Sequence, residues 1–184
     1  MESSVINSQS YLTFKLDNEI FGSTVNRILE IIEVPKITKV PKAPVYMRGV
    51  INLRGRVLPV IDTRIKFGMP PIEDTVDTCI VVLNIEVDGQ EITLGALVDA
   101  IQAVLEIEER EIQDPPAFGS GYRSDLLTGM VKKQDDFILV LDMEKVFSSQ
   151  EIITLKESGT SEAGPKEGTK RTPSKNKTQQ DSKN

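Results

Sequence analysis

Two aspartates, Asp62 and Asp142, each follow an apolar run, and they are the first residues to consider for acid–base chemistry. A hydrolytic carboxylate pair needs one acid with a raised pKa and a second one that stays ionised. Both aspartates hold the same place in a repeated pattern, at the end of a strand where the chain turns. Turn formation or capping explains both. We therefore predict that the chain is not an enzyme and has no catalytic residue.

The sequence contains no histidine and a single cysteine, Cys79. Without an imidazole the chain cannot form Ser-His-Asp or Cys-His nucleophiles, imidazole metal sites or a phosphoaccepting histidine. A lone cysteine inside the apolar run 79–83 is expected to be a buried thiol. Calcium-loop spacing and a glycine-rich turn that opens a helix are both missing from the sequence. We predict no cofactor and no metal.

The charge balance indicates which partners the chain can attract. There are 22 basic and 28 acidic residues, which gives a formal net charge of −6. Five basic residues fall between positions 48 and 66, but no aromatic side chain interleaves them as a platform for bases. An acidic chain does not attract polyphosphate, so we expect a protein partner and no nucleic acid. The sequence lacks a leader and a long apolar span, which predicts a cytoplasmic chain without direct membrane insertion.

Apolar residues recur mostly with period two, or in short runs rich in β-branched residues, which is typical of strands. Ten strands are predicted, over residues 11–16, 20–25, 28–34, 49–53, 57–63, 79–87, 92–98, 101–107, 127–132 and 137–141. A short C-terminal helix is predicted over 143–148, extending to about residue 155, with Asp142 as its cap. Residues 1–9 are expected to be frayed, and residues 156–184, with almost no apolar residue, to be a disordered tail.

The two halves of the chain share a pattern. Residues 21–28 and 94–101 both read apolar-Gly-x-x-Val-Asx-x-Ile, and segments 49–62 and 129–142 both place a glycine thirteen positions before an aspartate. Units of about 65 residues are marginal alone, but a shared apolar seam lets them bury a joint core. We predict an all-β fold of two packed five-stranded barrels, the first over residues 10–76 and the second over 77–142.

Arg54 lies in the turn region between two apolar strands, and it is a candidate for protein contact. Its guanidinium offers five donors and a stacking plane, which suits an interface anchor. A solvated turn arginine, or an internal salt bridge to Glu30 or Glu33, would explain the same residue. The sequence leaves these readings open.

Ile28 and Ile101 hold matching positions in the repeat, and Ile31 and Val104 follow three residues later. Matched apolar residues of two related barrels could line a shallow groove that accepts a helix from a partner. They could equally be ordinary core residues.

Several segments together resemble the CheW chemotaxis coupling proteins. They are Tyr-Leu-Thr-Phe at 11–14, Ile-Phe-Gly at 20–22, Ile-Leu-Glu-Ile-Ile at 28–32, Gly-Val-Ile-Asn-Leu-Arg-Gly at 49–55, Pro-Val-Ile-Asp at 59–62 and Val-Asp-Ala-Ile at 98–101. The segment 49–55 is highly specific. The resemblance runs in order over about residues 10–150, and it implies a domain over residues 10–155 built from two SH3-like five-stranded barrels.

The resemblance also implies a function. The family members are non-enzymatic adaptors that couple the cytoplasmic tip of methyl-accepting chemoreceptors to the regulatory domain of a CheA-type histidine kinase, and they are recruited to membrane-associated receptor arrays. By motif position, Glu30 and Arg54 would form a charged pair that binds a partner or supports an interface. The implied receptor-binding residues are Ile28, Gly49, Gly95, Ile101 and Val104.

Two alternatives stay open at this stage. One is a small-molecule-binding regulatory β-barrel protein. The other is a CheW-like coupling module of a non-flagellar pathway. The related CheV proteins add a receiver domain to the same module, and no doubly wound α/β pattern follows the barrels in this sequence.

Overall fold

The computed structural model describes residues 7–115 and 124–147, and this part of the chain is built mainly of strands. The strands are β1 (Ser8–Leu16), β2 (Glu19–Thr24), β3 (Ile28–Glu33), β4 (Met47–Leu53), β5 (Arg56–Asp62), β6 (Cys79–Val87), β7 (Gln90–Val98), β8 (Ala100–Glu108), β9 (Leu127–Lys133) and β10 (Asp136–Leu141). Two short α-helices, α1 (Thr63–Lys66) and α2 (Met143–Val146), and the 3₁₀ turns η1 (Val25–Arg27), η2 (Glu109–Glu111) and η3 (Ser124–Leu126) complete it.

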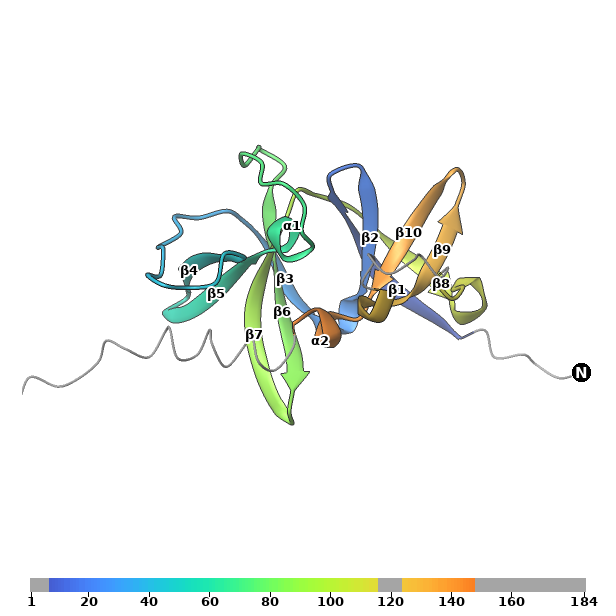
Figure 1. Cartoon of the computed structure of the whole chain (residues 1–184). Coiled ribbons are helices and arrows are strands. Elements are labelled where there is room, and N and C mark those ends of the chain that lie inside the picture. Colours follow the sequence, from blue (N-terminus) through green and yellow to red (C-terminus); the bar gives the residue numbers. More distant parts are fainter. Residues whose placement is uncertain (1–6, 116–123, 148–184) are drawn as a thin grey trace, which may run out of the picture.

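The strands form two five-stranded sheets that curl side by side (Figure 1). Sheet A has the order β8-β1-β2-β10-β9, and sheet B has the order β3-β6-β7-β5-β4. The pairs β2/β10 and β5/β7 are parallel, and the other pairs are antiparallel. The predicted all-β fold of two five-stranded units is confirmed.

Isolated bridges bring the chain after each edge strand back onto its own sheet. Thr38 donates from its backbone N–H to the carbonyl of Val50 at 2.9 Å and accepts in return at 2.8 Å. Gln113 and Met130 exchange the same two bonds in sheet A at 2.8 Å each. Since these contacts link the segments after β3 and β8 to β4 and β9, each sheet curls into a small barrel, barrel A or barrel B.

The predicted division of the chain at residues 76 and 77 is wrong. The hairpin β1–β2 joins β8, β9 and β10 in sheet A, whereas β6–β7 joins β3, β4 and β5 in sheet B. The repeat is present, because β8-β1-β2-β10-β9 and β3-β6-β7-β5-β4 match strand for strand. The hairpins are exchanged between the repeats. A repeat in sequence defines equivalent strands, but it does not define which copy of a strand pairs with which.

The chain ends differ from the expectation in one place. Strand β1 begins at Ser8, whose pairing with Glu108 makes residues 8 and 9 part of sheet A and not a frayed segment. Helix α2 is capped as predicted, since the Asp142 carboxylate accepts from the backbone N–H groups of Glu144 and Lys145. Residues 148–155 of the predicted helix and the predicted tail 156–184 lie outside the described residues.

The largest apolar cluster lies between the two sheets, and we call it the shared cluster. Its buried members come from both sheets and from α2, and they are Leu12, Phe14, Leu16, Phe21, Met47, Ile61, Val81, Leu83, Ile85, Val87, Leu94, Ala96, Val98, Leu126, Leu141, Met143, Val146 and Phe147. Smaller clusters fill the interior of barrel B, around Val60, and of barrel A, around Val131.

Strand β6 shows how the clusters are connected. Val81 and Leu83 point into the shared cluster, while Ile80 and Val82 point into barrel B, and all four are at most 2% exposed. Alternate side chains of a strand face opposite sides of a sheet, so β6 is buried on both faces. This explains its unbroken apolar run, which a strand with one solvated face would not have.

Leu83→Ala should test whether the two barrels form one cooperative unit. Leu83 is fully buried in the shared cluster, so we expect a loss of about 2–5 kcal/mol in the free energy of unfolding. Urea titration followed by circular dichroism, with hydrogen exchange read strand by strand, should show β1 and β6 unfolding together. The exposed Glu86→Ala on the same strand is the control and should change little. Separate transitions for the two sheets would contradict the shared core.

Candidate interaction site

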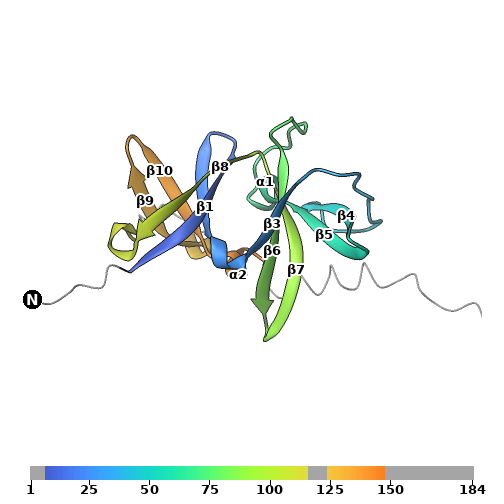
Figure 2. The same cartoon turned by 180° about the vertical axis from the view of Figure 1, so that it is seen from behind.

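Strands β3 and β8 are edge strands at equivalent places, one in each sheet, and both lie on the face seen in Figure 2. Each carries a bulge near its start. The pairing of β3 with β6 shifts between Ile28 and Glu30, so Leu29 is the additional residue. The pairing of β8 with β1 skips Gln102 in the same way. A β-bulge bends a strand and redirects its side chains, so the two matching bulges change the direction of both edges.

The bulges divide the apolar residues of each edge between two environments. Ile28 and Ile101 pack, half-buried, against the shared cluster. Further along β3, Ile32 packs into barrel B, and Leu105 on β8 packs into barrel A. The two predicted isoleucines are therefore brought to the same cluster, at the seam of the barrels, where they are part of the core, and the partner-groove interpretation stays a prediction.

Other apolar side chains on the same strands face outward. Leu29 and Val104 are each 59% exposed, and Ile31 is 43% exposed. We call these three residues the exposed edge residues. An exposed edge strand with large apolar side chains offers both unpaired backbone groups and a contact surface to another chain. Of the predicted receptor-binding residues, Val104 is the one whose side chain is mostly free for such contact.

Glu30 and Arg54 are brought together as a bidentate ion pair. Arg54 lies in the turn between β4 and β5 with φ of 50°, and its Nη1 and Nη2 atoms lie 2.7 Å from Oε1 and Oε2 of Glu30. The hydrogen bond to Glu30 and its negative charge raise the pKa of Arg54. The Arg54 side chain is still 76% exposed, against 24% for Glu30. The internal salt bridge to Glu30 that the sequence allowed is present, and the guanidinium stays exposed enough for the anchor interpretation to remain a prediction.

The counterpart positions in the second repeat are Ala103 and Gln134. Gln134 has φ of 55°, so the turn geometry is repeated without the charge. The positive φ at Arg54 is thus a property of the hairpin, and the ion pair is specific to barrel B. A different pair links Lys133 to Glu111 in barrel A at 2.6 Å, and this hydrogen bond lowers the pKa of Glu111.

Gly49 and Gly95, the other predicted receptor-binding residues, are buried in sheet B. Gly49 has φ of +146°, and a Cβ there would lie 2.3 Å from the carbonyl oxygen of Thr38. A Cβ on Gly95 would lie 2.6 Å from Cγ2 of Ile80. Both glycines permit close packing inside barrel B and present no side chain to a partner.

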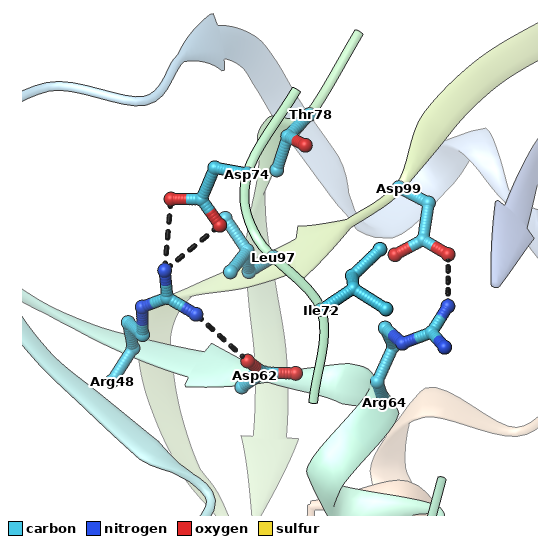
Figure 3. Close-up of a pocket in the computed structure, with 8 residues that line it drawn as sticks. All are labelled: Arg48, Asp62, Arg64, Ile72, Asp74, Thr78, Leu97 and Asp99. Atoms are coloured by element: carbon cyan, nitrogen blue, oxygen red, sulfur yellow. Dashed lines mark hydrogen bonds and ion pairs between the residues drawn. The ribbon is translucent and has the colours of Figure 1, made fainter. Parts of the chain in front are cut away.

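Two neighbouring groups of paired charges, one around Arg48 and one around Arg64, line a single pocket, and they were not predicted from the sequence. Figure 3 shows both arginines. Arg48 donates to Asp62 at 3.1 Å and to both carboxylate oxygens of Asp74 at 2.8 Å. Arg64 donates to Asp99 at 2.5 Å. Asp62 also caps α1 by accepting from the N–H of Ile65, which confirms the capping interpretation of this aspartate.

A signal for these paired charges is present in the sequence. Arg48, Asp62 and Arg64 belong to segments that are otherwise apolar, and a charged residue in such a segment needs a partner to be buried. The spacing does not say which carboxylate supplies it.

The remaining reactive groups can be placed as well. Cys79 is half-buried, and desolvation raises the pKa of its thiol, which keeps it protonated at neutral pH. Among residues 7–115 and 124–147 there is no group of three Cys, Asp or Glu side chains arranged to hold a metal ion. In the same residues, none of the helices has the length and apolar character that crossing a bilayer requires.

The fold and the site together define a class of protein. Two small barrels share one core, the charged groups of the seam are paired with each other, and apolar side chains remain exposed on two edge strands. This is a tandem β-barrel module whose exposed features suit contact with other proteins.

Comparison with known sequences identifies the family. The CheW-like domain matches residues 10–151, and the chain therefore belongs to the CheW-like family. The matched region begins in β1 and continues past α2, so it includes both barrels.

Named relatives cover most of the chain. The chemotaxis protein CheW of Klebsiella aerogenes is 32% identical over 144 residues, which is 78% of this chain and 84% of the relative. The chemotaxis protein CheW of Thermotoga maritima is 33% identical over 149 residues, covering 79% and 90%. The crystal structure of the scaffolding protein TtCheW from Thermoanaerobacter tengcongensis matches with a TM-score of 0.68 and 28% identity, over 82% of this chain and 95% of that one.

Gly49→Ala and Gly55→Ala should separate close packing from backbone strain. Both glycines have positive φ, but nothing lies within 4 Å of a Cβ on Gly55. We expect a loss in unfolding free energy of about 1–2 kcal/mol for Gly55→Ala. For Gly49→Ala we expect about 2–6 kcal/mol, because strain and the clash with Thr38 add. Chemical denaturation measures the loss in both variants. Equal losses would show that the close approach of Thr38 adds nothing to the cost of a side chain at position 49.

Proposed function

We propose that this chain is a chemotaxis scaffold that couples chemoreceptors to a CheA-type histidine kinase, and that it is not an enzyme. The observation that carries the proposal is the match of the CheW-like domain across both barrels, together with the match to TtCheW over 95% of that scaffolding protein. The exposed apolar side chains on β3 and β8 support a role in protein contact.

The receptor partner in this proposal is the cytoplasmic tip of a methyl-accepting chemoreceptor, which is helical. It packs on the exposed edge residues, with Ile28 and Ile101 beneath them at the seam. A helix that lays an apolar face against such a surface removes the exposed Val104 and Leu29 side chains from water. Gly49 and Gly95 contribute indirectly, because they hold the shape of barrel B.

The kinase partner is the regulatory domain of a CheA-type histidine kinase, and Arg54 is our candidate for contact with a partner at the end of barrel B. Glu30 holds the guanidinium in one orientation while most of its surface stays exposed. A held arginine loses less side-chain freedom on binding than a free one.

The mechanism that follows is coupling of equilibria. The shared cluster joins the two barrels into one body, so a receptor and a kinase bound to different parts of it are held in a defined relation. A change in the receptor then shifts the equilibrium between two arrangements of the kinase. The size of this shift is set by the difference in contact free energy between the two arrangements. The individual interfaces can be weak, since many copies in an array add avidity. In this proposal the protein works in the cytoplasm, recruited to membrane-associated arrays.

The pocket beside Arg48 and Arg64, which is lined by residues of barrel B and by Asp99, gives the small-molecule alternative no support. Its arginines and carboxylates are bound to each other, so they are not available to a ligand without breaking these pairs. The comparisons also name relatives as chemotaxis proteins.

Val104→Glu should weaken capture of a receptor tip fragment. It places a charge in an apolar contact, and we expect a loss of about tenfold in affinity. Val104 is a better test than Ile28 or Ile101, which pack against the shared cluster. Thr93→Glu, an exposed change on β7, is the matched control and should bind as the original protein does. Pull-down and calorimetry measure the loss, and unchanged receptor binding by a folded Val104→Glu variant would reject this surface.

Exchanging the charges of Glu30 and Arg54 should separate a partner contact from a structural role. Arg54→Glu alone puts two carboxylates together, and Glu30→Arg in the same chain restores the pair with the exposed charge reversed. We expect the double variant to recover the stability of the original protein and to remain defective in kinase activation in a reconstituted array assay. Recovery of activation by the double variant would show that Arg54 acts only within barrel B.

A further inference from the structure

The chain crosses between the two sheets at two junctions, and a short helix lies at each. It passes from β2 in sheet A to β3 in sheet B through η1, and from β7 in sheet B to β8 in sheet A through Asp99. Helix α1 follows β5 at the upper end of the seam, and α2 follows β10 at the lower end (Figure 1). The two junctions are counterparts in the repeat, because β2 corresponds to β7 and β10 corresponds to β5.

At the upper junction, the Asp99 carboxylate binds both barrels. Its Oδ2 atom accepts from Arg64 of α1 at 2.5 Å and from the backbone N–H of Asp17, in the β1–β2 turn, at 2.6 Å. The backbone N–H of Asp99 donates to the carbonyl of Lys15 on β1 at 3.1 Å. One side chain thus joins a helix that follows sheet B to a hairpin of sheet A.

Arg64 is fixed in place at this junction. Its side chain is only 5% exposed, and its Nε atom donates to the carbonyl of Pro70 at 3.1 Å. Asp17 supplies a second, more distant carboxylate at 3.5 Å. A few residues further on, Phe67 contacts Phe21 of sheet A, with ring centroids 5.6 Å apart. A buried guanidinium with several fixed partners can adopt few other positions, so the contact sets geometry as well as attraction.

The lower junction carries the opposite polarity. Glu144 is the second residue of α2, as Arg64 is the second residue of α1, and it pairs with Arg27 at the end of η1. Both side chains of this pair are 42% exposed. Each helix therefore lies beside an opposite charge at its own junction. If hairpin β1–β2 paired with β5 and hairpin β6–β7 with β10, Arg64 would instead approach Arg27, and Glu144 would approach Asp99. Both contacts would then join like charges, which disfavours that alternative pairing.

We propose that the Arg64–Asp99 pair is a lock that fixes the angle between barrels A and B, and that it thereby positions the surfaces on which a receptor tip binds. Arg64 and Asp99 are positioning residues, because their side chains are engaged inside the protein. The second part of this inference rests on the proposed function, since it requires a partner that contacts both barrels. The two pairs differ in burial, since the Arg64 and Asp99 side chains are 5% and 18% exposed while those of Arg27 and Glu144 are each 42% exposed, and the more buried pair holds the angle.

The angle can be measured between spin labels on the two barrels. Labels at Gln134→Cys in barrel A and Arg56→Cys in barrel B, both exposed positions, in a Cys79→Ser background, give an inter-barrel distance distribution by double electron–electron resonance. We expect one narrow distribution for the protein with its lock intact. Asp99→Asn, which keeps the shape of the side chain, and Arg64→Met, which keeps its apolar stem, should each broaden the distribution about twofold or more.

Glu144→Gln removes a charge from the exposed pair and should leave the distribution narrow. An unchanged distribution in folded Asp99→Asn and Arg64→Met variants would overturn the lock, and so would equal broadening in Glu144→Gln. Global unfolding of both lock variants would overturn it as well, because it would make the pair a requirement of folding and not of the angle.

Binding assays separate this inference from the proposed function. Asp99→Asn should lower the affinity for the receptor tip fragment about fivefold or more. Its affinity for a kinase regulatory domain that contacts one barrel should stay within about twofold of that of the original protein. Absence of receptor binding by the unmodified protein would refute the proposed function and leave the distance measurement intact. Normal receptor binding by an Asp99→Asn variant with a broadened distribution would refute the positioning role.

Discussion

The burial of apolar surface between the two sheets is the interaction on which the rest of the structure depends. Neither barrel has more than a small cluster inside it, whereas the shared cluster draws on both sheets and on α2. Strands β1 and β6 are buried on both faces as a result, and the composition is accordingly aliphatic, with no tryptophan in the sequence. A core in the seam leaves apolar side chains on the edges β3 and β8 exposed and free for contact with other proteins.

The two repeats have kept their architecture and changed their charges. The bulges at Leu29 and Gln102, the turn geometry of Arg54 and Gln134, and the capping aspartates Asp62 and Asp142 occur in both. The ion pair between Glu30 and Arg54 has an uncharged counterpart, and the second residues of α1 and α2, Arg64 and Glu144, have opposite charges. A protein that joins two different partners needs two different surfaces. In this fold the difference is carried by side chains on a nearly symmetric backbone.

Local patterning was sufficient to predict the strands and their positions along the chain. All ten predicted strands are present, and the turn that joins β6 to β7, at Asp88-Gly89, has the positive φ at both residues that is typical of a tight hairpin. The exchange of hairpins could not be predicted, because β2 and β7 have the same pattern and either could pair with β5. Helix α1 was missed because its four residues lie in a segment interpreted as the end of a strand and the turn after it. The charged seam was missed because the partners of Arg64 are far away in sequence, and no local rule connects Asp17, Arg64 and Asp99.

The exchanged hairpins also govern the order in which the protein can be completed as it leaves the ribosome. All five strands of sheet B are contained within Ile28 to Val98, so this sheet can assemble while the rest of the chain is still being translated. Sheet A needs β1 and β2, which precede sheet B in the chain, and β10, which follows it and ends at Leu141. The hairpin β1–β2 therefore emerges before any strand of sheet B but is fully paired only after translation passes β10, and until then sheet B is the part of this fold that can cover its apolar face.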